Sequence, residues 1–424
     1  MTHSPLLLQL VMILGTARVL GLVLRYFGQS AVIGEMTAGL VLGPIVFGSI
    51  APEWHAHVFQ PDSLGALRGL SELGLVLFMF IVGAELRLPM GVRKQIVAAS
   101  WIGILSIVVP MALGLGVAIV TYPTLAPFGV AFWPFALFMA SAMSITAFPV
   151  MARILKEREL TQTTLGRLSL TGAAVADVVA WIMLAMVVVL AGSDQSWTGF
   201  GATMGGLAAL AAIIFLVIRP AIAWLFGKFA RDGKPEGALL ASLLIGTFAC
   251  AYATEILNVH AVFGAFLFGA CLPRDDRLLE TLIERIEYVA LIVLMPIFFA
   301  LAGLNTTPDV FAGAGLGALG LILGAAIVGK VVGGAAGARI SGQPWRVSFA
   351  VGSLMNARGM MELIVIKVGL DIGVIGNSLF TMLMVMAIVT TFMTGPLLTL
   401  FGRGQSPAPP PPCLPQSQPP RAKC

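Results

Sequence analysis

The sequence has few charged residues. Asp, Glu, Lys and Arg together make up 11% of the 424 residues, which is less than half of the roughly 25% that is typical of soluble domains. Hydrophobic residues make up 58% of the chain, and its mean hydropathy is +0.97. Such a chain has too little polar surface to keep a globule of this size in water. The composition excludes an ordinary cytosolic enzyme and indicates a protein that lies mostly in lipid.

Residues that bind metals or carry redox chemistry are also scarce. The four cysteines are Cys250, Cys271, Cys413 and Cys424. They have no paired metal-ligand spacing, so we expect neither a disulfide framework nor a zinc site. No nucleophile, base and orienting residue stand together, and we do not expect an enzyme. The segment Gly315–Gly320 fits a dinucleotide fingerprint, but it opens a membrane helix with no strand before it, which favours helix packing over a cofactor.

Long apolar runs fill most of the chain, and about 20 such residues span a bilayer as a helix. We therefore predict an all-α polytopic membrane protein with about thirteen transmembrane helices. The predicted spans are residues 6–26, 31–50, 67–85, 96–120, 133–154, 168–192, 201–227, 237–256, 259–273, 288–304, 312–338, 347–369 and 376–401. The ninth is the shortest and could be a re-entrant helix, which would leave twelve spans.

The basic residues set the orientation of these spans. If the N-terminus lies outside, most of the 25 Lys and Arg residues fall in inward-facing loops, and the outer loops at 53–62 and 121–127 carry none. The positive-inside rule then predicts an outer N-terminus and a cytoplasmic C-terminus. It also explains the net charge of +5 without nucleic acid as a partner. We expect one transmembrane domain over residues 1–402 and a disordered Pro-rich tail over 403–424.

Two predicted spans are interrupted at mid-depth. The fifth carries Pro149 a few residues after Ser144, and proline removes a backbone donor and disfavours helix in the residue before it. The twelfth carries a polar patch that runs from Asn356 to Gly359. Ser144 and Met355 are 211 residues apart, which is seven spans, so the second copy runs in the opposite direction. This pattern predicts an inverted-topology repeat whose broken helices cross near the midplane.

Asp177 is the only acidic residue of the predicted sixth span. It lies about 13 Å into a hydrocarbon core about 30 Å thick. An ionisable group at that depth costs about 2.5–3.5 kcal/mol, which favours a functional role over a structural ion pair. A carboxylate can hold either a proton or an alkali cation. We therefore interpret Asp177 as the site that binds Na+ or K+, with Thr146 and Asn356, and secondarily Ser144, as further candidates at the two breaks.

Other charged residues also lie inside predicted spans. Lys330 is flanked by glycines at the spacing that lets helices approach closely, and it could be a structural counter-ion of Asp177 or itself carry a proton. Arg358 and Glu362 are four residues apart, so on one helix face they could neutralise each other. We retain Lys330 as an ion-site candidate and both residues of the second pair as secondary candidates.

Several motifs together resemble the monovalent cation:proton antiporters, in the branch of the plant cation/H+ exchangers and the bacterial potassium-efflux and Na+/H+ exchangers. The resemblance covers about residues 6–402 and rests on the segments Ile33–Pro44, Phe80–Leu86, Ser144–Val150, Ala261–Phe266 and Leu354–Leu363. It implies a homodimer in a bacterial inner membrane, with a six-helix core domain that moves like an elevator against a dimerisation domain. It also implies that Asp177 is the ion-binding carboxylate and that Lys330 occupies the conserved basic position.

One position departs from the family pattern. The family usually places Asn, Gln or Asp before the essential aspartate, whereas this chain has Ala176. The favoured function is antiport of Na+ or K+ against H+. Two alternatives remain open: a transporter of a different solute, such as an organic anion, on a related fold, and a membrane sensor that keeps the fold without transport.

Overall fold

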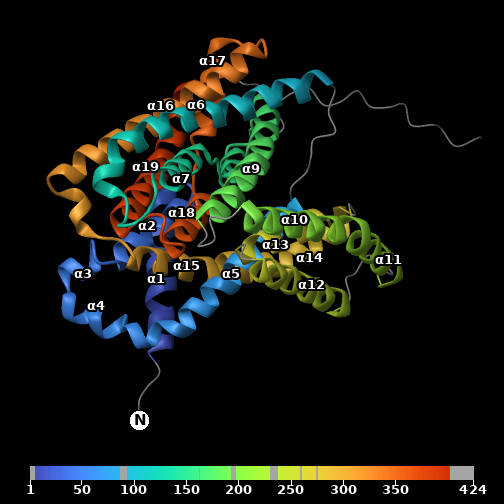
Figure 1. Ribbon diagram of the computed structural model, residues 1–424, viewed down its shortest axis with the longest axis horizontal. Coiled ribbons are helices and arrows are strands. Elements are labelled where there is room, and N and C mark those ends of the chain that lie inside the picture. The colour runs from blue at the N-terminus through green and yellow to red at the C-terminus, as the bar shows by residue number, and fades with distance from the viewer. Residues whose placement is uncertain are drawn as a thin grey trace, which may run out of the picture.

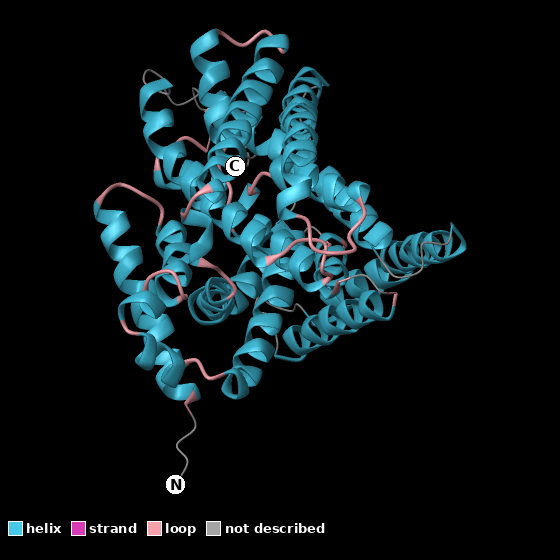
Figure 2. Ribbon diagram, turned by 60° about the vertical axis from the view of Figure 1, so that its left-hand side comes forward, coloured by secondary structure: helices cyan, strands magenta, loops and turns pink. Residues whose placement is uncertain are grey.

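The chain is helical throughout the part that the structure describes (Figure 2). The computed structural model describes residues 5–85, 93–161, 163–191, 197–229, 237–257, 260–273 and 276–401. The predicted tail at 403–424 lies outside these ranges. In the described residues, nine helical segments are long and apolar enough to cross a membrane, and two shorter apolar helices join them. The all-α membrane fold predicted from composition is confirmed.

The helices follow the predicted spans closely. In the first half they are α1 (Leu6–Tyr26), α2 (Ala31–Leu42), α3 (Phe47–Ile50), α4 (Pro52–Val58), α5 (Leu64–Glu85), α6 (Arg93–Leu125), α7 (Phe132–Ser144), α8 (Phe148–Glu157) and α9 (Thr164–Ala191). In the second half they are α10 (Trp197–Ile213), α11 (Arg219–Phe229), α12 (Gly237–Ile256), α13 (Ala261–Ala270), α14 (Asp276–Val289), α15 (Met295–Leu304), α16 (Ala314–Ile340), α17 (Trp345–Met355), α18 (Met360–Asp371) and α19 (Asn377–Phe401). The short α13 is the predicted ninth span.

Some boundaries differ from the prediction. The second span was expected to be one helix over 31–50, but α2 ends at Leu42, because Pro44 disfavours helical geometry in the residue before it. The tenth span is longer than expected, since α14 continues through a π-helical segment, Ala290–Leu294, into α15. A second π-helical segment, Ile214–Ile218, joins α10 to α11. Nothing in the sequence analysis had predicted either π-helical segment.

The helices form two packed groups (Figure 1). In one group α6 packs against α7, α9 and α16, and α16 packs against α17 and α19. In the other, α2 packs against α1 and α15, while α5 packs against α13 and α15. The two broken spans, α7 with α8 and α17 with α18, both belong to the first group. This group therefore contains every residue that the sequence marked as an ion-site candidate.

A row of glycines brings α16 close to α6. A Cβ atom at Gly329 would lie 2.8 Å from the Pro110 Cα atom, and one at Gly337 would lie 2.6 Å from the Ile102 Cα atom. Real Cβ atoms do not approach other atoms this closely, so only glycine fits at these positions. Lys330 follows the first of these glycines. The close approach places its side chain inside the group rather than toward lipid.

Candidate functional site

The fifth span breaks directly after Ser144. Helix α7 ends there, and Ile145 takes an extended conformation with φ −67° and ψ 141°. Helix α8 then begins at Phe148, so Pro149 is its second residue. Proline is well tolerated in the first turn of a helix, where its missing N–H has no partner in any case. Pro149 therefore starts a new half-helix, and the predicted break is confirmed.

The twelfth span breaks in the same way. Helix α17 ends at Met355 and α18 begins at Met360, so the two broken helices end at the two positions that the 211-residue offset relates. The two breaks touch through the main chain, because the amide of Ala147 donates to the carbonyl oxygen of Ala357 at 3.1 Å. The crossing of two broken helices, predicted from the repeat, is therefore present in the fold.

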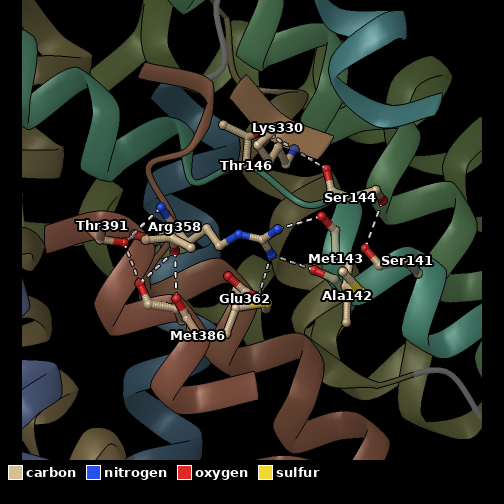
Figure 3. A network of polar contacts seen from close by, with 12 residues as sticks. Ser141, Ala142, Met143, Ser144, Thr146, Lys330, Arg358, Glu362, Met386 and Thr391 are labelled. Carbon is tan, nitrogen blue, oxygen red and sulfur yellow. Dashed lines mark hydrogen bonds and ion pairs between the residues drawn. The ribbon is translucent and has the colours of Figure 1, made fainter. Parts of the chain in front are cut away.

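The last four carbonyl groups of an α-helix have no partner within the helix. At the end of α7 all four are satisfied by side chains, from Ser144 Oγ to Ser141 O (2.8 Å), from Arg358 to Ala142 O (3.0 Å) and Met143 O (2.6 Å), and from Lys330 to Ser144 O (Figure 3). Three of these four hydrogen bonds come from cations, two from Arg358 and one from Lys330. They lie at the negative end of the α7 dipole, where positive charge is favourable.

Lys330 is fully buried at the break after α7 (Figure 3). Besides Ser144, its ammonium group donates to the hydroxyl oxygen of Thr146 at 2.6 Å and to the carbonyl oxygen of Ser106 on α6 at 3.1 Å. An ammonium group has three protons to donate, and these contacts use oxygen atoms from two helices and the break. Lys330 thereby connects α16, α6 and the first broken helix.

Arg358 forms a buried ion pair with Glu362, with 2.6 Å between Nη1 and Oε1. Both side chains have no exposed surface. This is the ion pair that the four-residue spacing of Arg358 and Glu362 predicted. The other carboxylate oxygen, Glu362 Oε2, is buried and has no hydrogen-bond partner among the described residues. Arg358 therefore joins the two breaks, because its guanidinium group contacts both α18 and the end of α7.

Threonines of α19 support the second break. The amide group of Asn356 donates to Thr390 O at 3.1 Å. The hydroxyl of Thr391 accepts from Arg358 N at 2.9 Å and donates to Arg358 O at 2.7 Å. The carbonyl oxygen of the Asn356 side chain, Oδ1, is buried and without a partner among the described residues. This oxygen is the kind of donor that a dehydrated alkali cation needs.

Asp177 lies near the middle of the 28 residues of α9. Its side chain lies outside the described part of the structure, so its contacts are not described. Helix α9 packs against α6, α7, α8 and α17, which places the backbone of Asp177 within the same group of helices as both breaks. Ala176, the position that departs from the family pattern, is buried.

Some residues of this network had no signal in the sequence. Ser106 contributes only a backbone carbonyl, which any residue would supply. Thr390 and Thr391 lie in a helix without charged residues, and its several threonines could have indicated a polar helix face. The contact of Arg358 with α7 spans more than 200 residues, so local spacing could not predict it.

Comparison with known proteins supports the resemblance. The family model described as "Sodium/hydrogen exchanger, transmembrane" matches residues 11–403. The chain is 37% identical over 395 residues to the Na(+)/H(+) antiporter NhaS4 of Synechocystis sp., covering 93% of this chain and 96% of the relative. It is 36% identical over 405 residues to Cation/H(+) antiporter 17 of Arabidopsis thaliana and 34% identical over 410 residues to K(+)/H(+) antiporter 1 of Saccharomyces cerevisiae, covering 95% and 94% of this chain.

These relatives differ in length. The chain spans about half of the plant and yeast proteins, 49% and 47% respectively. A solved structure of the sodium proton antiporter MjNhaP1 from Methanocaldococcus jannaschii at pH 8 matches with a TM-score of 0.62 over 94% of this chain and 99% of that chain. At 14% identity, this likeness establishes the fold alone.

Proposed function

The chain belongs to the sodium/hydrogen exchanger family, and from this premise we propose that it exchanges Na+ or K+ for H+ across the membrane by alternating access. The observation that carries the proposal is the crossing of two broken helices, joined by the bond between Ala147 and Ala357. In transporters with inverted repeats, such crossings lie near the midplane and hold the coupling ions. The relatives named as antiporters of Na+, K+ or other cations support the same reaction.

The chemistry of the crossing suits a small monovalent cation. Around the breaks lie the Thr146 hydroxyl group and the amide oxygen of Asn356, which has no partner among the described residues. Unwound carbonyls and the C-terminal ends of half-helices coordinate Na+ in other transporters. Asp177 supplies the carboxylate in this proposal, and Lys330 is a counter-ion that lies within the same group of helices.

The exchange follows from competition for one carboxylate. A bound cation favours the charged form of Asp177, whereas burial favours the protonated form. When the site faces the side with more cation, the cation displaces the proton, and the reverse occurs on the other side. The protein then alternates between a conformation in which the site is open to one side of the membrane and one in which it is open to the other side. Each transition carries one of the two ligands across.

We also propose the oligomeric state, the orientation and the location of the protein. It acts as a homodimer in the lipid bilayer, with an outer N-terminus and a cytoplasmic C-terminus, in a bacterial inner membrane. The positive-inside distribution of Lys and Arg supports the orientation. The cyanobacterial relative, which this chain matches over nearly its full length, supports a location in a bacterial membrane.

Two other functions would use the same fold. A transporter of organic anions would need a free cation at the crossing, but Arg358 is paired with Glu362 and with the end of α7. A sensor without transport is favoured by Ala176, which removes the polar side chain that the family usually places before Asp177. Proton flux from reconstituted vesicles on addition of Na+, K+ or Li+ separates these functions from exchange.

The sharpest variant for this assay is Asp177→Asn. The amide keeps the shape of the side chain but can neither take up a proton nor offer a full charge, so we expect cation-dependent proton flux to disappear while the protein still inserts. Glu53→Gln, at an exposed position of α4, is the matched control and should keep full activity. Exchange retained in Asp177→Asn would remove this carboxylate from the mechanism.

The same assay tests the competition. Protons and cations bind one group, so the apparent affinity for the cation should weaken as the pH falls through the pKa of Asp177. Measuring the half-saturating concentration of Na+ or K+ at several pH values gives this dependence. A half-saturating concentration that stays constant over the whole range would contradict competition for a single carboxylate.

A further inference from the structure

A cleft of about 490 Å³ opens between the two groups of helices. One wall comes from the first part of α5 and the end of α15, and the opposite wall comes from the second half of α18, with His260 beside them. Apolar residues, among them Leu75, Phe298 and Ile364, line part of it. Ile364 is two residues from Glu362, so the cleft extends toward the broken helices from the side on which α5 begins and α18 ends.

Two pairs of opposite charges line this cleft. Arg68 and Glu72 are four residues apart on α5, and Lys367 and Asp371 are four residues apart on α18. A spacing of four residues is about 6 Å along a helix and keeps both members on one helix face. Each wall of the cleft thus presents one positive and one negative group, with equal separation.

The order of the charges is opposite on the two walls. Helix α5 is buried over residues 74–83, so Arg68 lies nearer the exposed mouth of the cleft than Glu72. Asp371, the last residue of α18, is more exposed than Lys367, with 47% against 26% of the side-chain surface accessible, so Asp371 lies nearer the mouth. A positive group therefore faces a negative group at both depths when the walls meet, and the equal spacing lets both pairs form together.

In the present structure the charges on α18 pair within their own helix, through the ion pair of Lys367 with Asp371. That pair is partly exposed, with 26% and 47% of the side-chain surface accessible, and exposed pairs of this kind contribute little stability. Exchanging it for two pairs across a closed cleft, from which water is excluded, strengthens the electrostatic interactions.

We propose that Arg68, Glu72, Lys367 and Asp371 form the outer gate of the exchanger. The gate is open in this structure, and it closes when Arg68 pairs with Asp371 and Glu72 pairs with Lys367. These residues position the two walls and do not bind the transported ion. The proposal rests on the proposed exchange function, because a gate of this kind serves a cycle in which the cleft opens and closes.

The first test reverses the charges in the full-length protein in vesicles. Glu72→Lys alone and Lys367→Glu alone each place like charges at the inner level, and we expect each to slow cation-dependent proton flux about tenfold. The double variant restores opposite charges and should return the rate to within about threefold of the unmodified protein. Arg68→Glu and Asp371→Arg form the same cycle at the outer level.

A mismatched double variant gives the decisive comparison. Glu72→Lys with Asp371→Arg carries two reversals, as the matched doubles do, but places like charges at both levels, so it should be slower than either single variant. Glu53→Lys, at an exposed position of α4 outside the cleft, controls for an added lysine and should not change the rate. Equal rates for the matched and mismatched double variants would overturn the proposed pairing.

A second measurement does not depend on transport. Asn305 lines the cleft and is only half-buried in this open structure, so Asn305→Cys reports how often the cleft is open to a membrane-impermeant thiol reagent, with the labelled site identified by mass spectrometry. Adding Glu72→Lys should raise the labelling rate several-fold, and adding Lys367→Glu to that variant should lower it again. Labelling that ignores the charges contradicts the gate. Absence of exchange in the unmodified protein, with charge-dependent labelling, contradicts the proposed function instead.

Discussion

Arg358→Met removes the side chain that joins the two broken helices, and it should be among the most destabilising single changes in the protein. It leaves the buried carboxylate of Glu362 without its partner, which costs about 3–5 kcal/mol. It also leaves the carbonyls of Ala142 and Met143 unpaired, which costs about 1–3 kcal/mol each. The sum, about 5–11 kcal/mol, is similar to the whole unfolding free energy of a typical domain.

The double variant Arg358→Met/Glu362→Met tests the cause. It removes the uncompensated charge but keeps the unpaired carbonyls, so it should be more stable than Arg358→Met by about 3–5 kcal/mol. Lys367→Met in α18 is the matched stability control, because Lys367 also pairs with a carboxylate four residues away but is partly exposed. Its expected cost is about 0–1 kcal/mol.

The assay is thermal or denaturant unfolding of the purified protein in detergent, followed by circular dichroism or tryptophan fluorescence. The expected order of stability is the unmodified protein and Lys367→Met first, the double variant next and Arg358→Met last. A double variant that is no more stable than Arg358→Met would refute the reasoning, because the buried charge would then contribute nothing to the loss.

Three further predictions concern other parts of the molecule. Lys330→Gln should lower the melting temperature and leave some transport if Lys330 is a structural counter-ion; complete loss of transport with unchanged melting would instead indicate that it carries a proton. With Ala176 before Asp177, one carboxylate alternates between one proton and one cation, so exchange should be electroneutral, and the final Na+ gradient should not shift under a valinomycin-clamped potential. Gly264→Ala would place a methyl group against the Cys250 carbonyl and should lower the free energy of unfolding by about 1–3 kcal/mol. Gly317→Ala, where a Cβ atom would meet nothing within 4 Å, should leave the free energy of unfolding unchanged.

The local features of the fold could be predicted from the sequence. Proline and glycine act on their own backbone and on the adjacent residue, so Pro149 and Gly359 marked the two breaks to within a few residues. Apolar runs marked the spans because a bilayer requires a fixed length of helix. The ending of α2 at Leu42 was missed, although Pro44 acts in the same way, because the apolar run continues beyond it.

The partners of the buried charges were harder to predict. The four-residue spacing of Arg358 and Glu362 indicated their ion pair, although only Glu362 lies on α18 and Arg358 lies in the break before it. Nothing in the sequence indicated that Arg358 also binds the end of α7, because this contact depends on how two distant spans pack. The role of Asp177 remains a prediction, since its side chain lies outside the described part of the structure.

The hydrogen bond between Ala147 and Ala357 joins the breaks through main-chain atoms alone. No substitution by another non-proline residue removes an amide donor or a carbonyl acceptor, although a larger side chain would meet steric limits, since both alanines are buried. The crossing can therefore persist while the polar residues around it mutate. Ion preference can therefore change in evolution while the crossing of the two broken helices is kept. Directed selection for a new cation can vary the side chains near the breaks without removing the main-chain hydrogen bond that joins them.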